Sequence, residues 1–355
     1  MSAPVTVRRA LLYSGHGAAI EQVDPEPLGV SDLRVRVDAC GICGTDLELL
    51  SGRAFAGQLK LPVRPGHEVA GTVIEVGRRV AAFTVGDTVV LHSIAPCGQC
   101  AACLAGQENR CRRAEMLGLS GRGGFGDEVV WPASRAVRYR NLPAVQAALL
   151  PDAVATAYHA LRRAAVPPGG ILAVIGIGGL GTHLLQLAKI TRPDLTLGAV
   201  GRSEQSLARA QAIGAIPVRG LGQAGRDTAR RMGFFDVLVD VSGSPDALPF
   251  GLSTLRRGGR IVLASVLEVP PALGMSGTRF MTRELEIVGS FGSSIDELRE
   301  ATELADSGRL KLAGSVSEVI ALDELPGRLP ELITRGGGGG VRTIVVPRAA
   351  DGPSR

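Results

Sequence analysis

The sequence predicts an α/β protein in which a mostly-β N-terminal domain is followed by a doubly wound parallel sheet. With 355 residues, the chain exceeds what one compact hydrophobic core usually holds, so two domains are expected. Residues 1–150 contain short strands separated by irregular loops. After Pro151, apolar runs of strand length alternate with helical segments. This is the pattern of a parallel sheet covered by helices on both faces.

The strands of the first half are recognised by alternation and by β-branched residues. Leu33, Val35 and Val37 alternate with charged residues, as in a strand with one buried face. The segments 69–76 and 88–91 are rich in β-branched residues and have glycines close by. We expect all three segments to belong to one mostly-β domain.

The second half opens with an alanine-rich helix over 153–164, which ends before the Pro-Pro-Gly-Gly run at 167–170. Strands are then expected at 171–175, 197–200, 237–241 and 261–264. Helices are expected at 180–190, 207–213, 248–255 and 295–307, with a terminal strand at 343–346. The predicted domains are 1–152, completed by 291–355, and 153–290. The run of glycines at 336–340 is expected to form a surface loop.

Composition and charge exclude several classes of function. Hydrophobic residues at 45 % with 21 % charged residues describe an ordinary globular protein. No apolar run approaches the roughly 20 residues of a membrane span, and no secretory signal is recognised, so a cytoplasmic location is expected. The net charge of +5 comes from scattered arginines without interleaved aromatic residues, which argues against a nucleic-acid partner.

Four of the six cysteines form one closely spaced set, Cys97, Cys100, Cys103 and Cys111. Thiolates at these separations can surround one tetrahedral zinc ion without ligands from distant chain. The alternative is a set of disulfides or idle thiols, which a reducing compartment disfavours. With four protein ligands such a zinc has no open position, so it would brace a loop and perform no chemistry.

A second set of potential ligands is spread along the chain. Cys43 follows a predicted strand, and His67 with Glu68 precedes another. A catalytic zinc needs about three protein ligands and an open position. Asp152, at the start of the second half, is one candidate for the third ligand and His159 is the competitor, while a carboxylate there could also serve as a helix cap. Cys40 is expected to be a buried small residue.

A glycine-rich turn follows the strand expected at 171–175. The pattern Gly176-x-Gly178-x-x-Gly181, with Gly179 inside it, opens a helix. Such glycines allow a pyrophosphate to approach the helix N-terminus.

The next strand ends at Gly201, Arg202 and Ser203. An acidic residue commonly stands there and binds the ribose hydroxyls of NAD. Its absence, with a guanidinium beside it, favours the 2′-phosphate of NADP(H), although NAD(H) stays possible and Arg202 could be a solvated turn residue.

These motifs, in this order, resemble the medium-chain, zinc-dependent alcohol dehydrogenase family over almost the whole chain. Segments 86–89, 123–126 and 342–345 also match family segments. The resemblance implies a GroES-like catalytic domain and a Rossmann cofactor domain. It implies Cys43, His67 and Asp152 as catalytic zinc ligands, with Glu68 as a neighbouring or transient ligand.

Further roles are carried over by the same resemblance. Thr45 would accept the substrate proton and Asp46 would orient His67. Thr156 would touch the nicotinamide and Arg342 the pyrophosphate. Ser93, Phe125 and the residues around Phe55 would line the substrate pocket. A strand near 285–290 would pair two subunits of a homodimer or homotetramer.

One position departs from the family pattern. Many members carry a histidine five residues after the catalytic cysteine, where this chain has Glu48. The pattern from Cys43 to Glu48 looks like that of sugar dehydrogenases in the family. Glu48 would then bind a polyhydroxylated substrate or pass the proton to water.

The resemblance implies an oxidoreductase with two zinc ions per chain. It would transfer hydride between a secondary alcohol or its ketone and NADP(H) or NAD(H). A reductase of an imine or activated C=C bond is the main alternative. A non-catalytic cofactor-binding protein would be expected to have lost ligands, and none is lost here.

Overall fold

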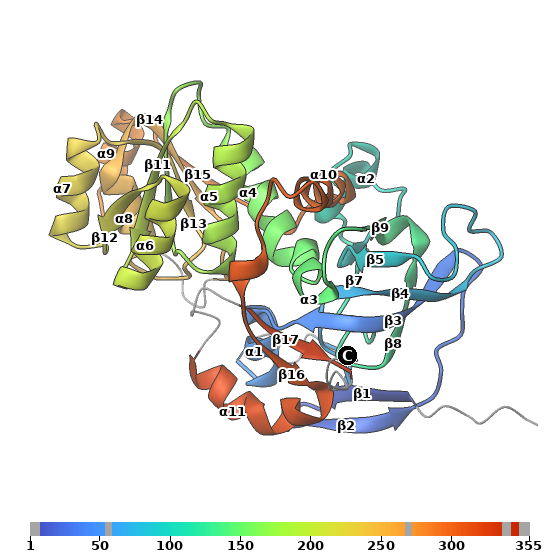
Figure 1. The fold of residues 1–355 in the computed structure, drawn as a ribbon. Coiled ribbons are helices and arrows are strands. Elements are labelled where there is room, and N and C mark those ends of the chain that lie inside the picture. The colour runs from blue at the N-terminus through green and yellow to red at the C-terminus, as the bar shows by residue number, and fades with distance from the viewer. Residues whose placement is uncertain (1–7, 54–58, 267–271, 336–341, 348–355) are drawn as a thin grey trace, which may run out of the picture. The chain divides into compact units, whose positions relative to one another are not determined.

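The computed structural model describes residues 8–53, 59–266, 272–335 and 342–347. The chain folds into two compact units, which are labelled by element in Figure 1. Unit 1 comprises Met1–Ala153 and Ser294–Arg355, and unit 2 comprises Val154–Ser293. The domains predicted from sequence, 1–152 with 291–355 and 153–290, divide the chain close to the same places.

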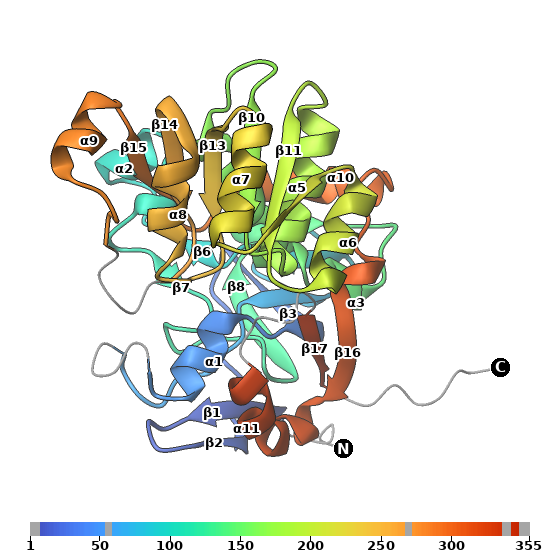
Figure 2. The same ribbon diagram turned by 90° about the vertical axis from the view of Figure 1, so that its left-hand side faces the viewer.

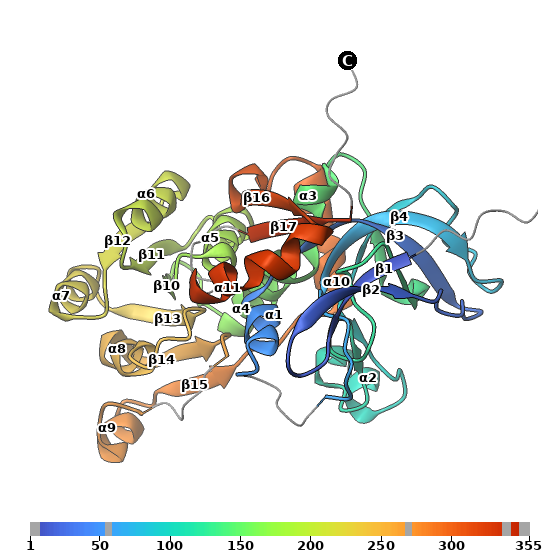
Figure 3. The same cartoon turned by 90° about the horizontal axis from the view of Figure 1, so that it is seen from below.

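Unit 1 is built on a seven-stranded sheet with the order β16-β17-β3-β4-β5-β9, and with β8 paired to β3. Its strands are β3 (Asp32–Gly41), β4 (Glu68–Val76), β5 (Thr88–Leu91), β8 (Glu128–Pro132), β9 (Ala136–Arg138), β16 (Val316–Ala321) and β17 (Arg342–Val346). Two two-stranded sheets accompany it, formed by β1 (Arg8–Tyr13) with β2 (Ala18–Val23), and by β6 (Ile94–Ala95) with β7 (Glu115–Met116). Strands β16, β17, β3 and β4 are successive neighbours in this sheet and are labelled in Figure 3. The mostly-β character predicted for the first half is confirmed.

The alternation predicted for β3 is confirmed except at Arg34. Leu33, Val35 and Val37 are buried in the core of unit 1. Arg34 on the other face is also buried, because its guanidinium is paired with Glu75 and Glu128 at 2.8 Å each. A charged residue in a strand therefore does not always face solvent when carboxylates neutralise it.

Helices of unit 1 lie around this sheet, and several are short. They are α1 (Gly44–Leu50), α2 (Ala101–Leu104), α3 (Ala144–Ala147), α10 (Ile295–Asp306) and α11 (Leu325–Arg335). Sequence analysis predicted α10, which begins at a Ser294–Glu297 capping box. It missed β16 and α11, which return the chain to the edge of the unit 1 sheet before β17.

Unit 2 is a six-stranded parallel sheet with the order β12-β11-β10-β13-β14-β15. Figure 2 labels β11, β10, β13, β14 and β15 in this succession. Its strands are β10 (Ile171–Ile175), β11 (Thr196–Gly201), β12 (Ile216–Arg219), β13 (Phe235–Asp240), β14 (Leu255–Leu263) and β15 (Glu286–Gly289). Its helices are α4 (Ala155–Ala164), α5 (Gly179–Thr191), α6 (Glu204–Ile213), α7 (Gln223–Arg231), α8 (Ala247–Thr254) and α9 (Gly277–Thr282). The predicted doubly wound sheet is confirmed. Its order reverses between β10 and β13, which is where such sheets bind ligands.

None of the helices in the described parts of the chain has the length and apolar composition of a membrane span.

The turn between β10 and α5 is held by glycines for two different reasons. Gly176 has a φ of +93°, a left-handed conformation that favours glycine. Gly181 lies in the first turn of α5, where an added Cβ would meet the carbonyl oxygen of Gly176 at 2.0 Å. The helix can therefore approach the strand only because Gly181 has no side chain.

We predict that Gly181→Ala lowers the free energy of unfolding by about 1–3 kcal/mol, because the methyl group would push α5 away from backbone that cannot yield. Chemical denaturation of the purified protein measures this change. The control is Gly277→Ala, since a Cβ at Gly277 meets nothing within 4 Å. Equal stability of the two variants would contradict the proposed close approach.

Candidate active site

The first potential ligand, Cys43, is fixed by the junction of β3 with α1. Cys43 is the N-cap residue of α1, in extended conformation. The Asp46 carboxylate accepts a hydrogen bond from the Cys43 backbone N–H at 2.9 Å. This closes the first turn of the helix and holds the Cys43 thiol beside it.

The same carboxylate reaches the loop that carries His67. Asp46 Oδ1 accepts a hydrogen bond from the Gly66 N–H at 3.1 Å and lies 3.3 Å from His67 Nδ1. The Asp46 side chain is 2 % exposed. Because a carboxylate engages Nδ1, Nε2 is the ring nitrogen that can coordinate a metal ion.

Close backbone packing explains why His67 lies where it does. Gly66 has a φ of +96°, and Gly124 donates a backbone hydrogen bond to the Gly66 carbonyl at 2.8 Å. A Cβ on Gly123 would meet the Arg64 carbonyl at 2.1 Å. Cys40 is fully buried, with its sulfur 2.8 Å from where a Gly124 Cβ would lie. The glycine-rich segment 123–126 therefore supports the histidine loop from behind.

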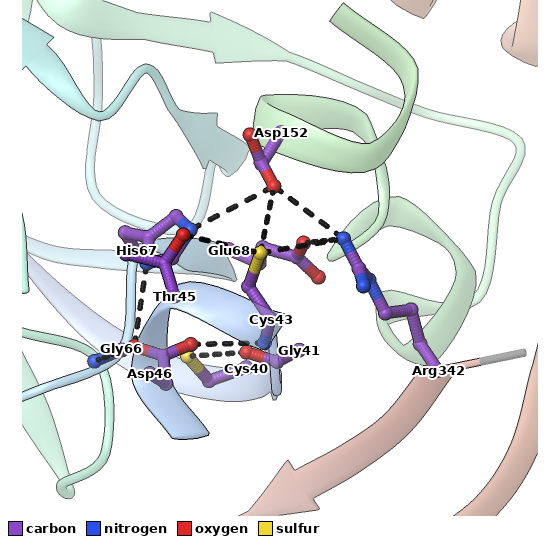
Figure 4. A network of polar contacts seen from close by, with 10 residues as sticks. All are labelled: Cys40, Gly41, Cys43, Thr45, Asp46, Gly66, His67, Glu68, Asp152 and Arg342. Carbon is purple, nitrogen blue, oxygen red and sulfur yellow. Dashed lines mark hydrogen bonds and ion pairs between the residues drawn. The ribbon is translucent and has the colours of Figure 1, made fainter. Parts of the chain in front are cut away.

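Asp152 comes to this site from a π-helical turn, Leu150–Val154, and not from the regular helix that was predicted to start at residue 153. The α-helix begins at Ala155, and its N-cap is Val154 without a side-chain hydrogen bond. Asp152 is therefore not the cap of α4. Its Oδ2 lies 3.3 Å from Cys43 Sγ and 3.7 Å from His67 Nε2, as Figure 4 shows.

Glu68 and Arg342 complete the network drawn in Figure 4. The Glu68 side chain is fully buried, and its Oε1 lies 2.9 Å from Arg342 Nη2. The same nitrogen lies 3.4 Å from Asp152 Oδ2 and 3.5 Å from Cys43 Sγ. Arg342 thus balances part of the negative charge, and its predicted contact with a cofactor pyrophosphate stays a prediction.

The burial of this network changes the acidity of its members. Burial raises the pKa of the Cys43 thiol, although the charge of Arg342 opposes the shift. Burial raises the pKa of Glu68 to about 8, again against Arg342. For Asp152, burial is outweighed by the hydrogen bond and charge of His67 and by Arg342, so its pKa is lowered.

Four of these residues offer donor atoms to one point. The ligand atoms of Cys43, His67, Glu68 and Asp152 all lie within 4.8 Å of one another. Sulfur, imidazole nitrogen and carboxylate oxygen are the donors that zinc accepts. The donor set and its compactness therefore fit a zinc ion.

The four-cysteine loop forms a second such group. The Cys97, Cys100, Cys103 and Cys111 sulfurs also lie within 4.8 Å of one another. All six cysteines of the chain are free thiols. Arg113 Nη2 lies 3.3 Å from Cys97 Sγ and donates a hydrogen bond to it. Four thiolate donors with a cation beside them fit a closed zinc site.

Thr45 and Glu48 are three residues apart on α1, so they share one face of the helix. Thr45 Oγ1 lies 3.9 Å from Cys43 Sγ. Both side chains are half-buried. The structure thus places Thr45 at the edge of the cluster.

The residues that the resemblance assigns to a substrate pocket differ in their burial. Phe125 is fully buried in the core of unit 1, so its assignment to a pocket lining is wrong. Ser93 is half-buried. Phe55 lies outside the described residues. Thr156 and His159 are on α4, in unit 2.

The carboxyl edge of the unit 2 sheet presents the features of a dinucleotide site. Helix α5 begins after Gly178 without a side-chain cap, so its first N–H groups are available to an anion. Gly179 is the first residue of that helix. Gly201 ends β11, and Ser203 caps α6 by accepting a hydrogen bond from the Ser206 N–H. These features fit the phosphates of a nicotinamide cofactor.

Asp240 supports this edge and was missed from the sequence. It pairs in register with Ile175 across β10 and β13. Its Oδ1 accepts hydrogen bonds from the Ser242 N–H at 2.8 Å and hydroxyl at 2.6 Å. Burial raises the pKa of Asp240. A Cβ on Gly176 would lie 2.9 Å from Ser242 Cα, so Asp240 holds backbone directly against the glycine turn.

Comparison with known proteins places this architecture in a family. The model of the alcohol dehydrogenase GroES-like domain matches residues 29–143, and that of the zinc-binding dehydrogenase matches residues 179–307. An alcohol dehydrogenase of Geobacillus stearothermophilus is 31 % identical over 86 % of this chain and 90 % of its own length. The chain belongs to the medium-chain, zinc-dependent alcohol dehydrogenase family.

Two further relatives of this alcohol dehydrogenase-type oxidoreductase carry more specific names. The NAD-dependent alcohol dehydrogenase of Sulfolobus acidocaldarius is 30 % identical over 90 % of this chain and 93 % of its own. The acryloyl-coenzyme A reductase of Sulfurisphaera tokodaii is 30 % identical over 87 % of this chain and 92 % of its own.

Solved structures of the family superpose over nearly the whole chain. A protein of the zinc-binding dehydrogenase type from Sinorhizobium meliloti, bound to NADP, has a TM-score of 0.84 at 27 % identity, covering 96 % of this chain and 100 % of that one. A cobalt- and zinc-bound alcohol dehydrogenase from Pyrobaculum aerophilum has a TM-score of 0.82 at 28 % identity, covering 96 % and 99 %.

We predict that Asp46→Asn weakens metal binding by about 10–100-fold, because the residue that orients a metal-binding histidine tunes its affinity. An amide group would also turn a donor toward the N–H of Cys43 or Gly66, which costs about 1–3 kcal/mol of stability. Competition with a chelator and chemical denaturation measure the two effects. Asp38→Asn is the control for metal affinity, since Asp38 is not among the clustered ligands and its carboxylate binds Arg36 and Thr72. Wild-type zinc affinity in Asp46→Asn would contradict the role of Asp46.

Proposed function

We propose that the protein is a zinc-dependent dehydrogenase that interconverts a secondary alcohol and its ketone, with preference for NADP(H). The observation that carries the proposal is the buried convergence of sulfur, nitrogen and carboxylate donors beside Thr45. A group of this composition in an alcohol dehydrogenase-type fold suits a catalytic zinc.

In this proposal Cys43, His67 and Asp152 hold the catalytic zinc. Glu68 forms an ion pair with Arg342 and is a neighbouring carboxylate that can also approach the metal. Cys97, Cys100, Cys103 and Cys111 hold a second, structural zinc. When bound, the catalytic zinc supplies Lewis acidity toward the substrate oxygen, and the nicotinamide carries the hydride.

The residues of α1 provide the proton path. Thr45, at the edge of the cluster, accepts the proton that the alcohol loses on its hydroxyl oxygen and releases its own hydroxyl proton toward Glu48 or water. Glu48, one turn later on the same face, takes the place of the histidine that ends the relay in many relatives. It either passes the proton to water or hydrogen-bonds a second hydroxyl of the substrate. Polyols, sugars, cyclitols and simple secondary alcohols are the substrate classes to test.

The names of the relatives do not agree on one cofactor. The proposed choice of cofactor therefore rests on the residues at the end of β11 in this chain. The Sulfolobus acidocaldarius enzyme is called NAD-dependent, and the Sinorhizobium meliloti structure contains NADP. In this chain Gly201 stands where an acidic residue would repel a 2′-phosphate, and Arg202 is exposed beside it. NADP(H) is therefore the proposed cofactor, with Thr156 toward the nicotinamide and Arg342 toward the pyrophosphate.

The experiment that tests the function is a screen of the zinc-loaded enzyme. Reduction of NADP+ and NAD+ is measured with polyols, aminocyclitols and simple secondary alcohols, before and after removal of metal. Metal-dependent oxidation of an alcohol is the expected result. Metal-independent reduction of an activated C=C bond, without alcohol oxidation, would favour the alternative suggested by the relative named acryloyl-coenzyme A reductase.

We predict two zinc ions per chain with different effects of their loss. Cys103→Ser should lower the stability and solubility of the protein, because a structural zinc contributes folding free energy. Cys43→Ser should leave a folded protein that binds cofactor but is inactive. Elemental analysis, thermal denaturation and cofactor titration measure these effects. Active wild-type protein containing one zinc or none would refute the assignment.

The choice between Asp152 and His159 gives a second prediction. Asp152→Asn should weaken binding of the catalytic zinc and reduce kcat by orders of magnitude, because the amide cannot supply the charge of a carboxylate ligand. His159→Asn should have a mild effect. Zinc content and turnover of the two variants decide the question. The opposite result would assign the third ligand to His159.

The protein is proposed to be a cytoplasmic homodimer or homotetramer. None of its six cysteines forms a disulfide, which suits a reducing compartment. Strand β15 is the terminal strand of the unit 2 sheet and exposes Ile287. An apolar edge strand can pair with its copy across a twofold axis. Light scattering at micromolar concentration should give at least a dimer, and a monomer would refute the pairing.

A further inference from the structure

Arg202 is one candidate for binding the cofactor phosphate. A second arginine, Arg209, contacts the glycine turn of unit 2 and belongs to no motif identified in the sequence. Arg209 is on α6, the helix that follows β11. Its Nη2 donates a hydrogen bond to the carbonyl oxygen of Ile177 at 3.4 Å. Ile177 stands between Gly176 and Gly178. Arg209 therefore spans the space between the helix after β11 and the turn before α5.

The charge of Arg209 is not balanced by the protein around it. Among the described residues, no carboxylate forms an ion pair with Arg209 or with Arg202. By contrast, Arg219, which pairs in register with Gly201 on the neighbouring strand, forms an ion pair with Glu204. Glu204, the first residue of α6, is thus already engaged. Arg202, which follows β11, and Arg209 on α6 are therefore two guanidinium groups without an ion pair to a carboxylate in the described part of the chain.

The guanidinium of Arg209 also has donors to spare. A guanidinium carries five N–H donors, and the described contacts of Arg209 use the one on Nη2 that faces Ile177. Its Nε is buried without a hydrogen-bond partner among the described residues. Because unmade hydrogen bonds of a charged group are costly, the arrangement favours an additional acceptor. Phosphate oxygens match the planar fork of a guanidinium.

Gly201 lacks the carboxylate that accepts hydrogen bonds from the ribose hydroxyls of NAD, and the residues around it are closely packed. A Cβ at Gly201 would lie 3.0 Å from Ser206 Oγ and 3.1 Å from Leu207 Cδ2. The Ser206 hydroxyl is fixed there, since it donates a hydrogen bond to the Ser203 carbonyl at 2.8 Å. A side chain at position 201 would therefore require the Ser206 and Leu207 side chains to give way by a few tenths of an ångström. The edge is built around glycine, with positive charge and without a carboxylate for ribose hydroxyls.

We propose that Arg209, together with Arg202, binds the 2′-phosphate of NADP(H) and is a specificity-determining residue for the cofactor. The inference rests on the proposed function, because it concerns the same cofactor site. In this fold the pyrophosphate lies at the N-terminus of the first helix and the ribose hydroxyls lie at the end of the second strand. Arg209 comes from the helix that follows the second strand, and its hydrogen bond to Ile177 places its guanidinium beside the turn that precedes the first helix.

The test uses two nucleotides that differ only in the 2′-phosphate, adenosine 2′,5′-bisphosphate and adenosine 5′-monophosphate. Their binding to the zinc-loaded protein is measured by calorimetry, which does not depend on turnover. Arg209→Gln should weaken the bisphosphate by about 10–100-fold and the monophosphate by less than about threefold, as expected for one charge-assisted contact. Arg209→Lys should be intermediate, because lysine keeps the charge but loses the fork. In kinetics, the change should appear in kcat/KM for NADP+ and not for NAD+.

The control is Arg231→Gln, which removes an exposed positive charge at the end of α7 in the same unit. It should change binding of neither nucleotide. Equal weakening of both nucleotides by Arg209→Gln would overturn the proposal, since Arg209 would then support the glycine turn or the 5′-phosphate. Should Arg209→Gln fail to fold, Arg209→Lys gives the same comparison.

Failure of this inference can be told from failure of the proposed cofactor preference. Wild-type protein that binds the bisphosphate no more tightly than the monophosphate would refute the NADP(H) preference itself. A wild-type preference that survives Arg209→Gln but disappears in Arg202→Ala would refute the role of Arg209 alone.

Discussion

The candidate metal site depends on one buried carboxylate, Asp46. Its two oxygens bind the backbone of Cys43 and of Gly66 and lie against the His67 ring. Cys43 follows the end of β3 and His67 precedes the start of β4, so more than twenty residues of chain separate them. A buried carboxylate that satisfies two N–H groups and a ring nitrogen fixes their separation, because leaving any of them unpaired is costly. The separation of Cys43 and His67 is therefore set by hydrogen bonds within the protein.

Much of this organisation could be predicted from the sequence. The apolar run at 171–175 and the glycine turn after it identified β10 and α5, since strand, turn and helix signals agreed there. The four-cysteine spacing and the positions of Cys43 and His67 identified both potential ligand groups. Local signals of this kind are carried by neighbouring residues, so one sequence suffices to read them.

Other features depend on contacts between distant segments and could not be read in the same way. The π-helical turn that carries Asp152 looked like the start of α4, because hydrophobic periodicity does not distinguish the two. Phe125 lies in the core because the 123–126 segment packs against the histidine loop. The pairing of Arg342 with Glu68 joins residues on different strands that only the sheet topology brings together.

That topology makes the site of unit 1 depend on the C-terminal part of the chain. Strand β17 pairs with the end of β3, where Val345 faces Cys40 in register and Thr343 accepts a hydrogen bond from the Ile42 N–H. This pairing brings Arg342 to Cys43, Glu68 and Asp152. Without Arg342, a buried thiol and two carboxylates would face one another with only His67 to offset their charge. Unit 2 is inserted between these segments of sequence, so unit 1 completes its site only after the chain returns from unit 2.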